Sequence, residues 1–300
     1  MESIALNPKS IDVLIEQLKD STGIEFKCYR RNFLERRIKG RMIRLGLTTD
    51  RSYLDYILSN PQEIELFLDR FTINYTYFFR NIEIFEKLRS IFFACKTGKF
   101  QMTSDLHGDL SHLSIYDKIR RDYAYKEEGL KIWSCACASG EEPYSLAIML
   151  EQLKEEIPNF PKYDLIASDI DSNIIKQARM GFYTEDALKE IPQNYILTHF
   201  TKFHDRLGPK YLIGNDIKRK VEFIVEDVTK GHNRPQKYDI IFCRYLLIYI
   251  NRSFRENLLR ILENHLVKGG LLILGKTETL LNAKLNFKLL DGRNHFYVKS

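Results

Sequence analysis

The sequence lacks an uninterrupted apolar run of the about 20 residues that a membrane-spanning helix needs, and its first 19 residues lack the apolar segment of a secretory signal peptide. It has only five cysteines and no CxxC pair. The odd number argues against a disulfide framework, and the spacing argues against a zinc site. We therefore expect a cytoplasmic protein that is not embedded in a membrane and binds no metal.

The three-glycine pattern GxGxxG is also absent, so a nicotinamide or flavin cofactor is not the first expectation. The sequence shows no internal repeat and no RNA-binding module, and nucleic acid is not expected as a partner. What the 300 residues do contain is 44% hydrophobic residues, enough to bury the core of one large domain and a smaller one.

The positive charge of the chain is concentrated in one place. The formal net charge is +6, yet residues 27–44 hold eight basic residues and one acidic residue. A helix is predicted over 30–45, and Arg30, Arg37, Arg41 and Arg44 form a stripe along it. Such a stripe suits an acidic protein partner by complementary charge, and we expect it to bind the substrate. A solvated basic face without a partner is the alternative.

The order of predicted elements divides the chain in three. Residues 1–92 have helical periodicity throughout, and residues 93–129 are polar and weakly periodic, which predicts a linker or insertion. Residues 130–300 alternate strands and helices, which predicts a parallel sheet covered on both faces, with a last strand that pairs antiparallel. We expect strands at 131–135, 163–167, 221–225, 238–243, 271–274 and 295–298. We also expect a β-hairpin that joins 211–213 to 217–225.

A run of small residues follows the first strand of this sheet. The sequence KIWSCACASGEEPYS over 131–145 reads as a buried strand, a tight turn and the start of a helix. Small residues let the backbone approach a ligand, and a helix start offers N–H groups and a positive dipole end. An open α/β sheet holds a nucleotide-like cofactor at this edge.

Two aspartates follow the next strands. Asp169 ends the second strand, where an acidic residue can accept hydrogen bonds from ribose hydroxyls, while Asp171 can cap the following helix. Asp227 follows the strand at 221–225, where it can bind an adenine amino group while Val228 packs on the ring. For Asp227 a plain turn aspartate is the alternative, and spacing alone favours it.

Donor-rich side chains occur in an aromatic segment before the sheet. Asn74, Thr76 and Arg80 lie in the sequence NYTYFFR. The segment can be an aromatic packing element with a polar edge. Buried polar groups need partners, however, and the carboxylate of a ligand would supply one. Farther along, Tyr249 follows Tyr245 by four residues and can face a reacting centre.

Together these motifs resemble the chemotaxis receptor methyltransferase (CheR) family, which uses S-adenosylmethionine. The resemblance spans about residues 10–298, and the combination of its pieces is specific. The matching residues are Asn74-x-Thr76-x-Phe78-Phe79-Arg80, Trp133-Ser134, Ser139-Gly140-Glu141-Glu142-Pro143-Tyr144-Ser145, Ala167-Ser168-Asp169-Ile170-Asp171, Phe242-Cys243-Arg244, Ile248-Tyr249 and Gly275-x-Thr277-Glu278.

The resemblance implies an α/β fold, a class I S-adenosylmethionine-dependent methyltransferase with a Rossmann-like sheet. A small N-terminal all-α domain precedes the sheet, and an antiparallel β-subdomain is inserted at about 193–220. It also implies a monomer that methylates glutamate side chains in the cytoplasmic helical domain of chemotaxis receptors. The products would be glutamate methyl esters and S-adenosylhomocysteine.

The resemblance also assigns roles to residues. Arg80 and Tyr249 would lie beside the methyl donor and the substrate carboxylate as catalytic residues. The implied cofactor contacts are Asn74, Thr76, Arg80, Glu141, Glu142, Asp169, Asp227, Val228, Tyr245 and Leu246. The chain departs from the family where Tyr245 replaces a usual Asn, Asp227 a common Asn and Lys276 a frequent His.

Two other functions fit parts of the sequence. The basic stripe permits a methyltransferase that acts on RNA or on a small molecule. The replacement at Tyr245 permits a non-catalytic module that senses the cofactor or docks on a receptor. Transfer of a base-labile methyl label to protein would separate these alternatives from the first.

Overall fold

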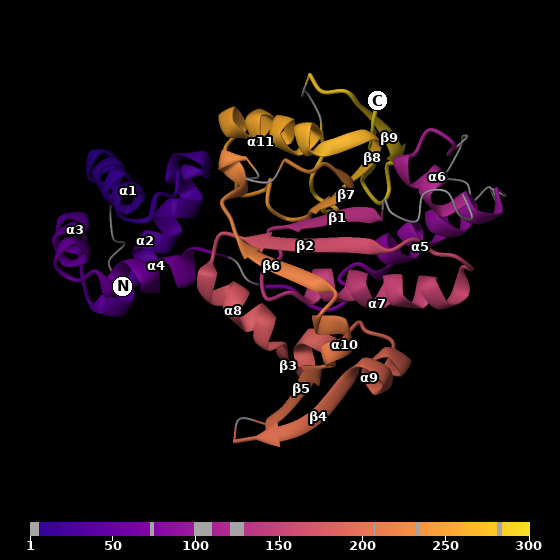
Figure 1. Ribbon diagram of the computed structural model, residues 1–300. Helices are drawn as coiled ribbons and strands as arrows, with labels where there is room; N and C mark the ends of the chain where they lie inside the picture. Colours follow the sequence, from indigo (N-terminus) through magenta and orange to yellow (C-terminus); the bar gives the residue numbers. More distant parts are fainter. Residues whose placement is uncertain are drawn as a thin grey trace. The chain divides into compact units, whose positions relative to one another are not determined.

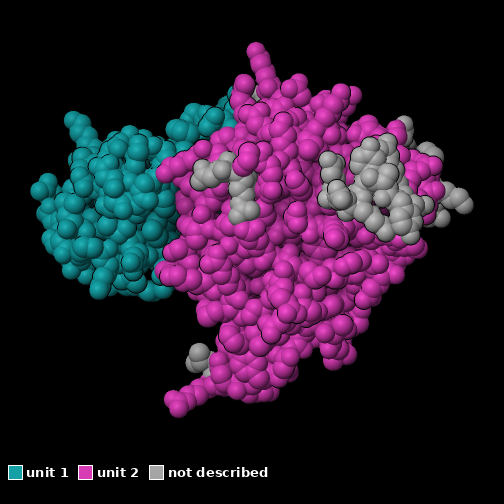
Figure 2. All heavy atoms as spheres, viewed as in Figure 1, with its two compact units in different colours: residues 1–73, 246–258 teal, residues 74–245, 259–300 magenta. Residues whose placement is uncertain are grey.

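The computed structural model describes residues 6–72, 75–98, 110–120, 129–206, 208–231, 235–280 and 284–300. The chain forms two compact units (Figure 2). The smaller unit contains Met1–Ile73 and Leu246–Leu258, and the larger contains Asn74–Tyr245 and Leu259–Ser300. The first boundary therefore falls at residue 73, whereas the sequence predicted an N-terminal domain of 1–92 and a second domain over 130–300.

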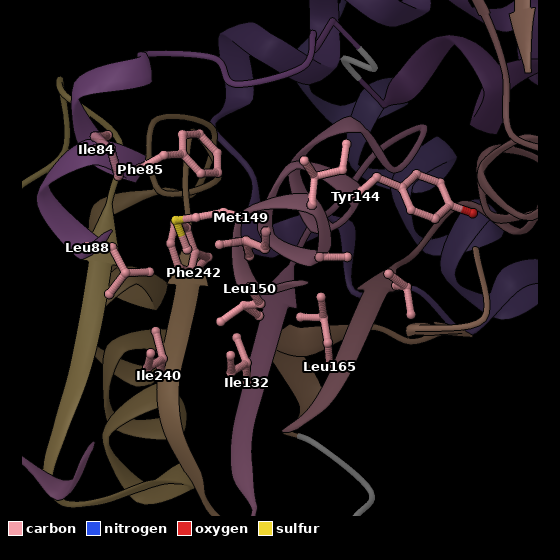
Figure 3. Packing of buried hydrophobic residues seen from close by; sticks show 14 of the residues in the cluster. Ile84, Phe85, Leu88, Ile132, Tyr144, Met149, Leu150, Leu165, Ile240 and Phe242 are labelled. Atoms are coloured by element: carbon pink, nitrogen blue, oxygen red, sulfur yellow. The ribbon is translucent and has the colours of Figure 1, made fainter. Parts of the chain in front are cut away.

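The helix α5 (Ile82–Thr97) explains the earlier boundary. Its residues Ile84, Phe85 and Leu88 are almost fully buried in the same apolar cluster as the strands of the large sheet. Figure 3 shows these side chains directed toward Ile240 and Phe242 of the sheet. Because α5 buries its apolar face against the sheet, it belongs to the larger unit.

The smaller unit is helical, as the periodicity predicts. Side-chain caps start two of its helices, since Asn7 accepts from the N–H of Lys9 and Thr49 accepts from that of Ser52. Glycine in the left-handed region ends others, with φ 72° at Gly23 and 69° at Gly46. The elements are α1 (Pro8–Thr22), η1 (Phe26–Cys28), α2 (Arg31–Leu45), α3 (Asp50–Ser59) and α4 (Gln62–Phe71).

The second segment of this unit, Leu246–Leu258, was not foreseen. Main-chain hydrogen bonds attach it to the segment before α2. The N–H of Arg30 donates to the carbonyl of Tyr249 at 2.8 Å, and the N–H of Asn251 donates to that of Cys28 at 2.8 Å. These bonds bring Tyr249 beside the N-terminus of the helix that holds the basic stripe.

The larger unit is built on a seven-stranded sheet of order β6-β2-β1-β7-β8-β10-β9. The first five strands in this order are parallel, and β10 pairs antiparallel with both β8 and β9. The parallel sheet with an antiparallel last strand is thus confirmed. The strands are β1 (Leu130–Cys135), β2 (Tyr163–Asp169), β6 (Val221–Val225), β7 (Tyr238–Cys243), β8 (Leu266–Leu274), β9 (Phe287–Asp291) and β10 (Phe296–Lys299).

Both faces of this sheet are covered. Ile132 of β1 is paired with Ile240 of β7 and packs toward α5 and α7 (Glu141–Glu156) (Figure 3). Trp133, the next residue, points to the other face, where its ring lies 5.9 Å from that of His265 in α11 (Arg252–His265). Figure 1 shows α7 and α8 (Ser172–Met180) on one side of the sheet and α11 on the other. The carboxyl ends of β1, β2, β6 and β7 therefore meet at one edge.

A second, three-stranded antiparallel sheet has the order β3-β5-β4 and confirms the predicted β-subdomain. Its strands are β3 (Phe182–Thr184), β4 (Phe200–Asp205) and β5 (Gly208–Ile213), so it begins before residue 193. The predicted hairpin of 211–213 with 217–225 is wrong. The helix α10 (Asn215–Lys218) follows β5, and the N–H of Gly214 is bonded to the carbonyl of His199, so β5 pairs with β4 instead.

Short elements complete the larger unit. They are η2 (Glu185–Leu188), α9 (Gln193–His199) and η3 (Val228–Lys230). In the segment predicted as a linker, α6 (Ser114–Arg120) contributes Ile115 and Ile119 to the core, and Lys118 forms an ion pair with Asp239 at 2.8 Å. The described part of this segment is thus a packed element of the sheet domain. The rest of the predicted insertion, 99–109 and 121–128, lies outside the described residues.

None of the helices formed by the described residues is long and apolar enough to cross a bilayer. No group of three or more His, Cys, Asp or Glu side chains among these residues could hold a metal ion. The five cysteines are buried, and none of them forms a disulfide.

Candidate active site

The turn after β1 holds an unusual backbone. Ala136 has φ 58°, Ala138 has φ 48° and Gly140 has φ 92°, so three of five consecutive residues are left-handed. This conformation costs alanine about 1 kcal/mol or more. Hydrogen bonds hold the turn at the end of β2, because the N–H of Cys137 donates to the carbonyl of Ser168 at 3.0 Å. Strained turns of this kind are typical of ligand sites.

Asp169 is the acidic residue at the end of β2, as predicted. Its carboxylate accepts from the N–H of Ala138 at 2.9 Å and from the N–H of Asp171 at 3.1 Å. Burial raises the pKa of Asp169 to about 6, against the opposing effect of these hydrogen bonds. Asp171 caps α8 through the N–H groups of Asn173 and Ile174. Asp169 therefore anchors the turn, and its contact with ribose stays a prediction.

Glu141 and Glu142 open α7 but have different surroundings. The Glu142 carboxylate accepts from Ser134 Oγ at 2.7 Å and from Arg244 Nη1 at 3.0 Å. Glu141 is 4% exposed, and its carboxylate accepts from Ser139 Oγ at 2.7 and 2.9 Å. Burial raises the pKa of Glu141 to about 7. Among the described residues Glu142 pairs with a cation and Glu141 does not. Cofactor contacts by either carboxylate remain predictions.

Asp227 lies after β6 and has one oxygen in use. Its Oδ1 accepts from the N–H and the hydroxyl of Thr229, at 3.0 and 2.6 Å, and so caps η3. Through Oδ1, Asp227 thus acts as the turn aspartate that was the alternative expectation. Its Oδ2 is buried without a hydrogen-bond partner in the described part of the chain, and the adjoining Val228 is 8% exposed. A buried acceptor beside an apolar side chain suits an aromatic ring with an amino group.

Arg80 lies among aromatic rings. Its guanidinium carbon is 3.8 Å from the centroid of the Tyr245 ring and 5.7 and 5.8 Å from those of Tyr75 and Tyr77. Its Nη1 donates to the carbonyl of Tyr75 at 3.0 Å. No carboxylate among the described residues pairs with it. Thr76 is half-buried nearby in sequence, and Asn74 lies outside the described residues.

Two site residues escaped the sequence reasoning. Arg244 is buried and donates through Nη2 to the Asn81 Oδ1 at 2.8 Å and to the carbonyl of Arg80 at 2.7 Å. Asn81 itself is left-handed, with φ 62°. The signal was present, because asparagine is enriched in this conformation and Arg244 lies in the matched Phe-Cys-Arg motif. Together they connect Arg80 to Glu142.

In the smaller unit, Tyr249 lies beside Phe33 and Arg37. The rings of Phe33 and Tyr249 are 5.0 Å apart, and the guanidinium of Arg37 is 5.1 Å from the Phe33 ring. Arg37 is half-buried, and its Nε has no partner within the described ranges. Burial and, less strongly, the charge of Arg36 lower the pKa of Arg37. Arg37 and Tyr249 are therefore candidates to bind an anion.

The other members of the predicted stripe differ from one another. Arg30 and Arg44 are exposed. Arg41 requires a correction, because it is 5% exposed and bound through two hydrogen bonds to Glu63 inside the helical unit. It cannot face a partner while that pair is intact. Leu246, a predicted cofactor contact, is half-buried at the start of the segment 246–258.

The donors and acceptors at the sheet edge fit a nucleoside that bears an amino acid. Asp227 supplies an unsatisfied acceptor for an amino group, and Arg80 supplies a cation without a carboxylate. Asp169 and the strained turn lie between the two in chain order. These residues therefore fit S-adenosylmethionine, whose adenine and carboxylate need these partners.

Comparisons with known proteins agree with this fold and with this cofactor. Residues 104–296 match the family model for the CheR methyltransferase, SAM binding domain, and residues 9–72 match the model for its all-alpha domain. The fold and the site thus define a methyltransferase that binds S-adenosylmethionine. The chain belongs to the CheR methyltransferase family.

Curated relatives resemble the chain over most of its length. It is 26% identical over 287 residues to the chemotaxis protein methyltransferase of Borreliella burgdorferi, which covers 94% of this chain and 92% of the relative. It is 29% identical to chemotaxis protein methyltransferase 2 of Vibrio cholerae, with 86% and 81% covered. It is 25% identical to the chemotaxis protein methyltransferase of Escherichia coli, with 96% and 90% covered. The predicted family, fold class and cofactor are confirmed.

Proposed function

We propose that this protein transfers the methyl group of S-adenosylmethionine to glutamate side chains of chemotaxis receptors. The observation that supports an acidic substrate is the state of Arg37. This cation is half-buried, and its Nε has no partner among the described residues. It lies beside the aromatic pair Phe33 and Tyr249. A buried N–H donor without a partner is costly, and a substrate carboxylate would satisfy it.

The cofactor would be held at the carboxyl edge of the large sheet. Asp227 Oδ2 would accept from the adenine amino group, and Asp169 would accept from the ribose hydroxyls. Arg80 would pair with the cofactor carboxylate, and Glu141 with its ammonium group. When bound, the cofactor supplies an electrophilic methyl group on a positively charged sulfur.

The reaction then needs no strong base. The residues of this chain have only to position the acceptor glutamate. A glutamate side chain is already ionised near neutral pH, so its oxygen can attack the methyl carbon directly. The carbon–sulfur bond breaks and its electron pair stays on sulfur, which leaves a neutral ester and a neutral thioether. Tyr249 would donate its hydroxyl proton in a hydrogen bond to the acceptor carboxylate, whose attacking oxygen must lie in line with the methyl carbon and the sulfur.

The receptor itself would bind along the exposed part of the basic helix. Arg30, Arg37 and Arg44 remain available on or near the surface of α2, and complementary charge draws an acidic helix toward them. The attraction between exposed charges is screened by salt, so methylation should slow as ionic strength rises.

The proposal is tested with methyl-labelled S-adenosylmethionine, the purified protein and the cytoplasmic fragment of a receptor from the same organism. We expect label in the receptor that mild alkali releases as methanol, and none in total RNA from that organism. A receptor fragment whose methylated glutamates are changed to glutamine should take up no label. Alkali-stable label, or label in RNA alone, would overturn the proposal.

Tyr249 offers a second test. Tyr249→Phe keeps the ring contact with Phe33 and removes the hydroxyl. We expect kcat for methyl transfer to fall about tenfold or more while the Kd for S-adenosylhomocysteine stays within about twofold. Unchanged kcat would remove Tyr249 from the mechanism.

A further inference from the structure

Tyr245 is held in a conformation that tyrosine seldom adopts. Its φ is 61°, in the left-handed region that favours glycine and asparagine. Two hydrogen bonds keep it there. Its N–H donates to Glu278 Oε2 at 2.6 Å, and its hydroxyl donates to Asn81 Oδ1. The same Glu278 oxygen accepts from the N–H of Gly275 at 2.8 Å, which fixes the carboxylate itself.

The result of this conformation is a ring laid against Arg80. The guanidinium carbon lies 3.8 Å from the Tyr245 ring centroid, well inside the range of a cation–π contact. Tyr75 and Tyr77 are about 2 Å farther away from that carbon, at 5.7 and 5.8 Å. Of these three rings, that of Tyr245 therefore makes the closest contact with the Arg80 cation.

The partners of Tyr245 are rigid. Asn81 Oδ1, which accepts from the tyrosine hydroxyl, also accepts from Arg244 Nη2 at 2.8 Å. The side chain of Arg244 is 2% exposed, and it also pairs with Glu142 at the start of α7. The orientation of the ring is thus fixed by the first turn of the helix that follows the strained turn. A ring held in this way limits the rotamers of Arg80.

We propose that Tyr245 is a positioning residue, which acts on the cofactor through Arg80. The ring holds the guanidinium toward the carboxylate of the cofactor. The inference rests on the proposed role of Arg80 toward that carboxylate. Its consequence is selectivity, because loss of the ring should weaken only ligands that carry the carboxylate.

Calorimetry with two ligands tests this. S-Adenosylhomocysteine carries the carboxylate, and 5′-methylthioadenosine has the same nucleoside without it. For Tyr245→Leu we expect roughly threefold to thirtyfold weaker binding of S-adenosylhomocysteine and unchanged binding of methylthioadenosine. Tyr245→Phe keeps the ring but loses the hydroxyl bond to Asn81. It should therefore lose less affinity for S-adenosylhomocysteine than the leucine variant, and it should bind methylthioadenosine as the wild type does.

Further variants distinguish misfolding, a wrong role for Tyr245 and a wrong role for Arg80. Tyr245→Gly removes the ring and tolerates the left-handed backbone, so it tests the same prediction if the leucine variant does not fold. Arg80→Ala should show the same selective loss, and adding Tyr245→Leu to it should cost nothing more. An equal loss of both ligands on removing the ring, or a phenylalanine variant as weak as leucine, would overturn the inference. If Arg80→Ala were not selective, the proposed role of Arg80 would fail instead.

Discussion

The most specific stability prediction concerns Arg41 in the helical unit. Its Nε and Nη2 donate to the two carboxylate oxygens of Glu63 at 2.7 and 2.6 Å, and the Tyr53 hydroxyl donates to Oε1 of Glu63 at 3.0 Å. The two ionic side chains are 5% and 2% exposed. Arg41→Met fills similar space and leaves the carboxylate without its cation. Breaking a buried pair in this way costs about 3–5 kcal/mol.

The pH dependence makes the prediction sharper. A buried carboxylate that has lost its cation can take up a proton instead, and protonating an ordinary glutamate at pH 7 costs about 3.7 kcal/mol but at pH 5 only about 1 kcal/mol. We therefore expect Arg41→Met to destabilise the helical unit by about 3–4 kcal/mol at pH 7 and clearly less at pH 5. The variant Arg41→Met/Glu63→Leu should recover most of the loss.

The assay is urea unfolding followed by circular dichroism. Tryptophan fluorescence is unsuitable, because the one tryptophan of the chain, Trp133, lies in the larger unit. If Arg41→Met unfolded within about 0.5 kcal/mol of the wild type at both pH values, the burial of this pair would be refuted. Arg41 would then be a surface residue available to a partner.

Three further predictions concern the site and the basic helix. Burial raises the pKa of Glu141 to about 7, so its carboxylate destabilises the fold increasingly as pH rises from about 4.5 to 7. Glu141→Gln has no such charge. Between pH 5 and pH 8 the free energy of unfolding of this variant should therefore rise by about 2 kcal/mol relative to that of the wild type, measured by thermal unfolding. Asp227→Ala should weaken S-adenosylhomocysteine binding about tenfold by calorimetry, since the acceptor for the adenine is lost; unchanged affinity would contradict this. Arg44→Glu should slow receptor methylation at low salt, whereas the same reversal at the exposed Arg51 of α3 should not.

Much of the sheet could be predicted from the sequence, because its strands are buried on both faces and read as continuous apolar runs. The motif around 131–145 likewise placed the turn, the helix and the edge where a ligand would bind. The strand β9 could not be predicted in the same way, since it lies at an edge and Leu289 is 61% exposed. Local pattern gives no clear signal for a strand that buries little surface.

The class of ligand could be predicted from the sequence, but the contacts of individual side chains could not. The spacing placed Arg41 in line with Arg37 and Arg44, but only the fold brings Glu63 from another helix to bury it. The sequence likewise gave no sign that Tyr245 is left-handed, because tyrosine is rarely found there. Contacts between segments far apart in the chain decide both cases, and periodicity does not report such contacts.

The most direct test of the proposed function is mass spectrometry of the receptor fragment after reaction with S-adenosylmethionine and the enzyme. The account predicts peptides heavier by one methylene group, with the added mass on glutamate, and its loss after mild alkali. It also predicts that Tyr249→Phe forms less of the same product at the same residues. Methylation on lysine or arginine, or an unmodified receptor while a small molecule is methylated, would contradict it.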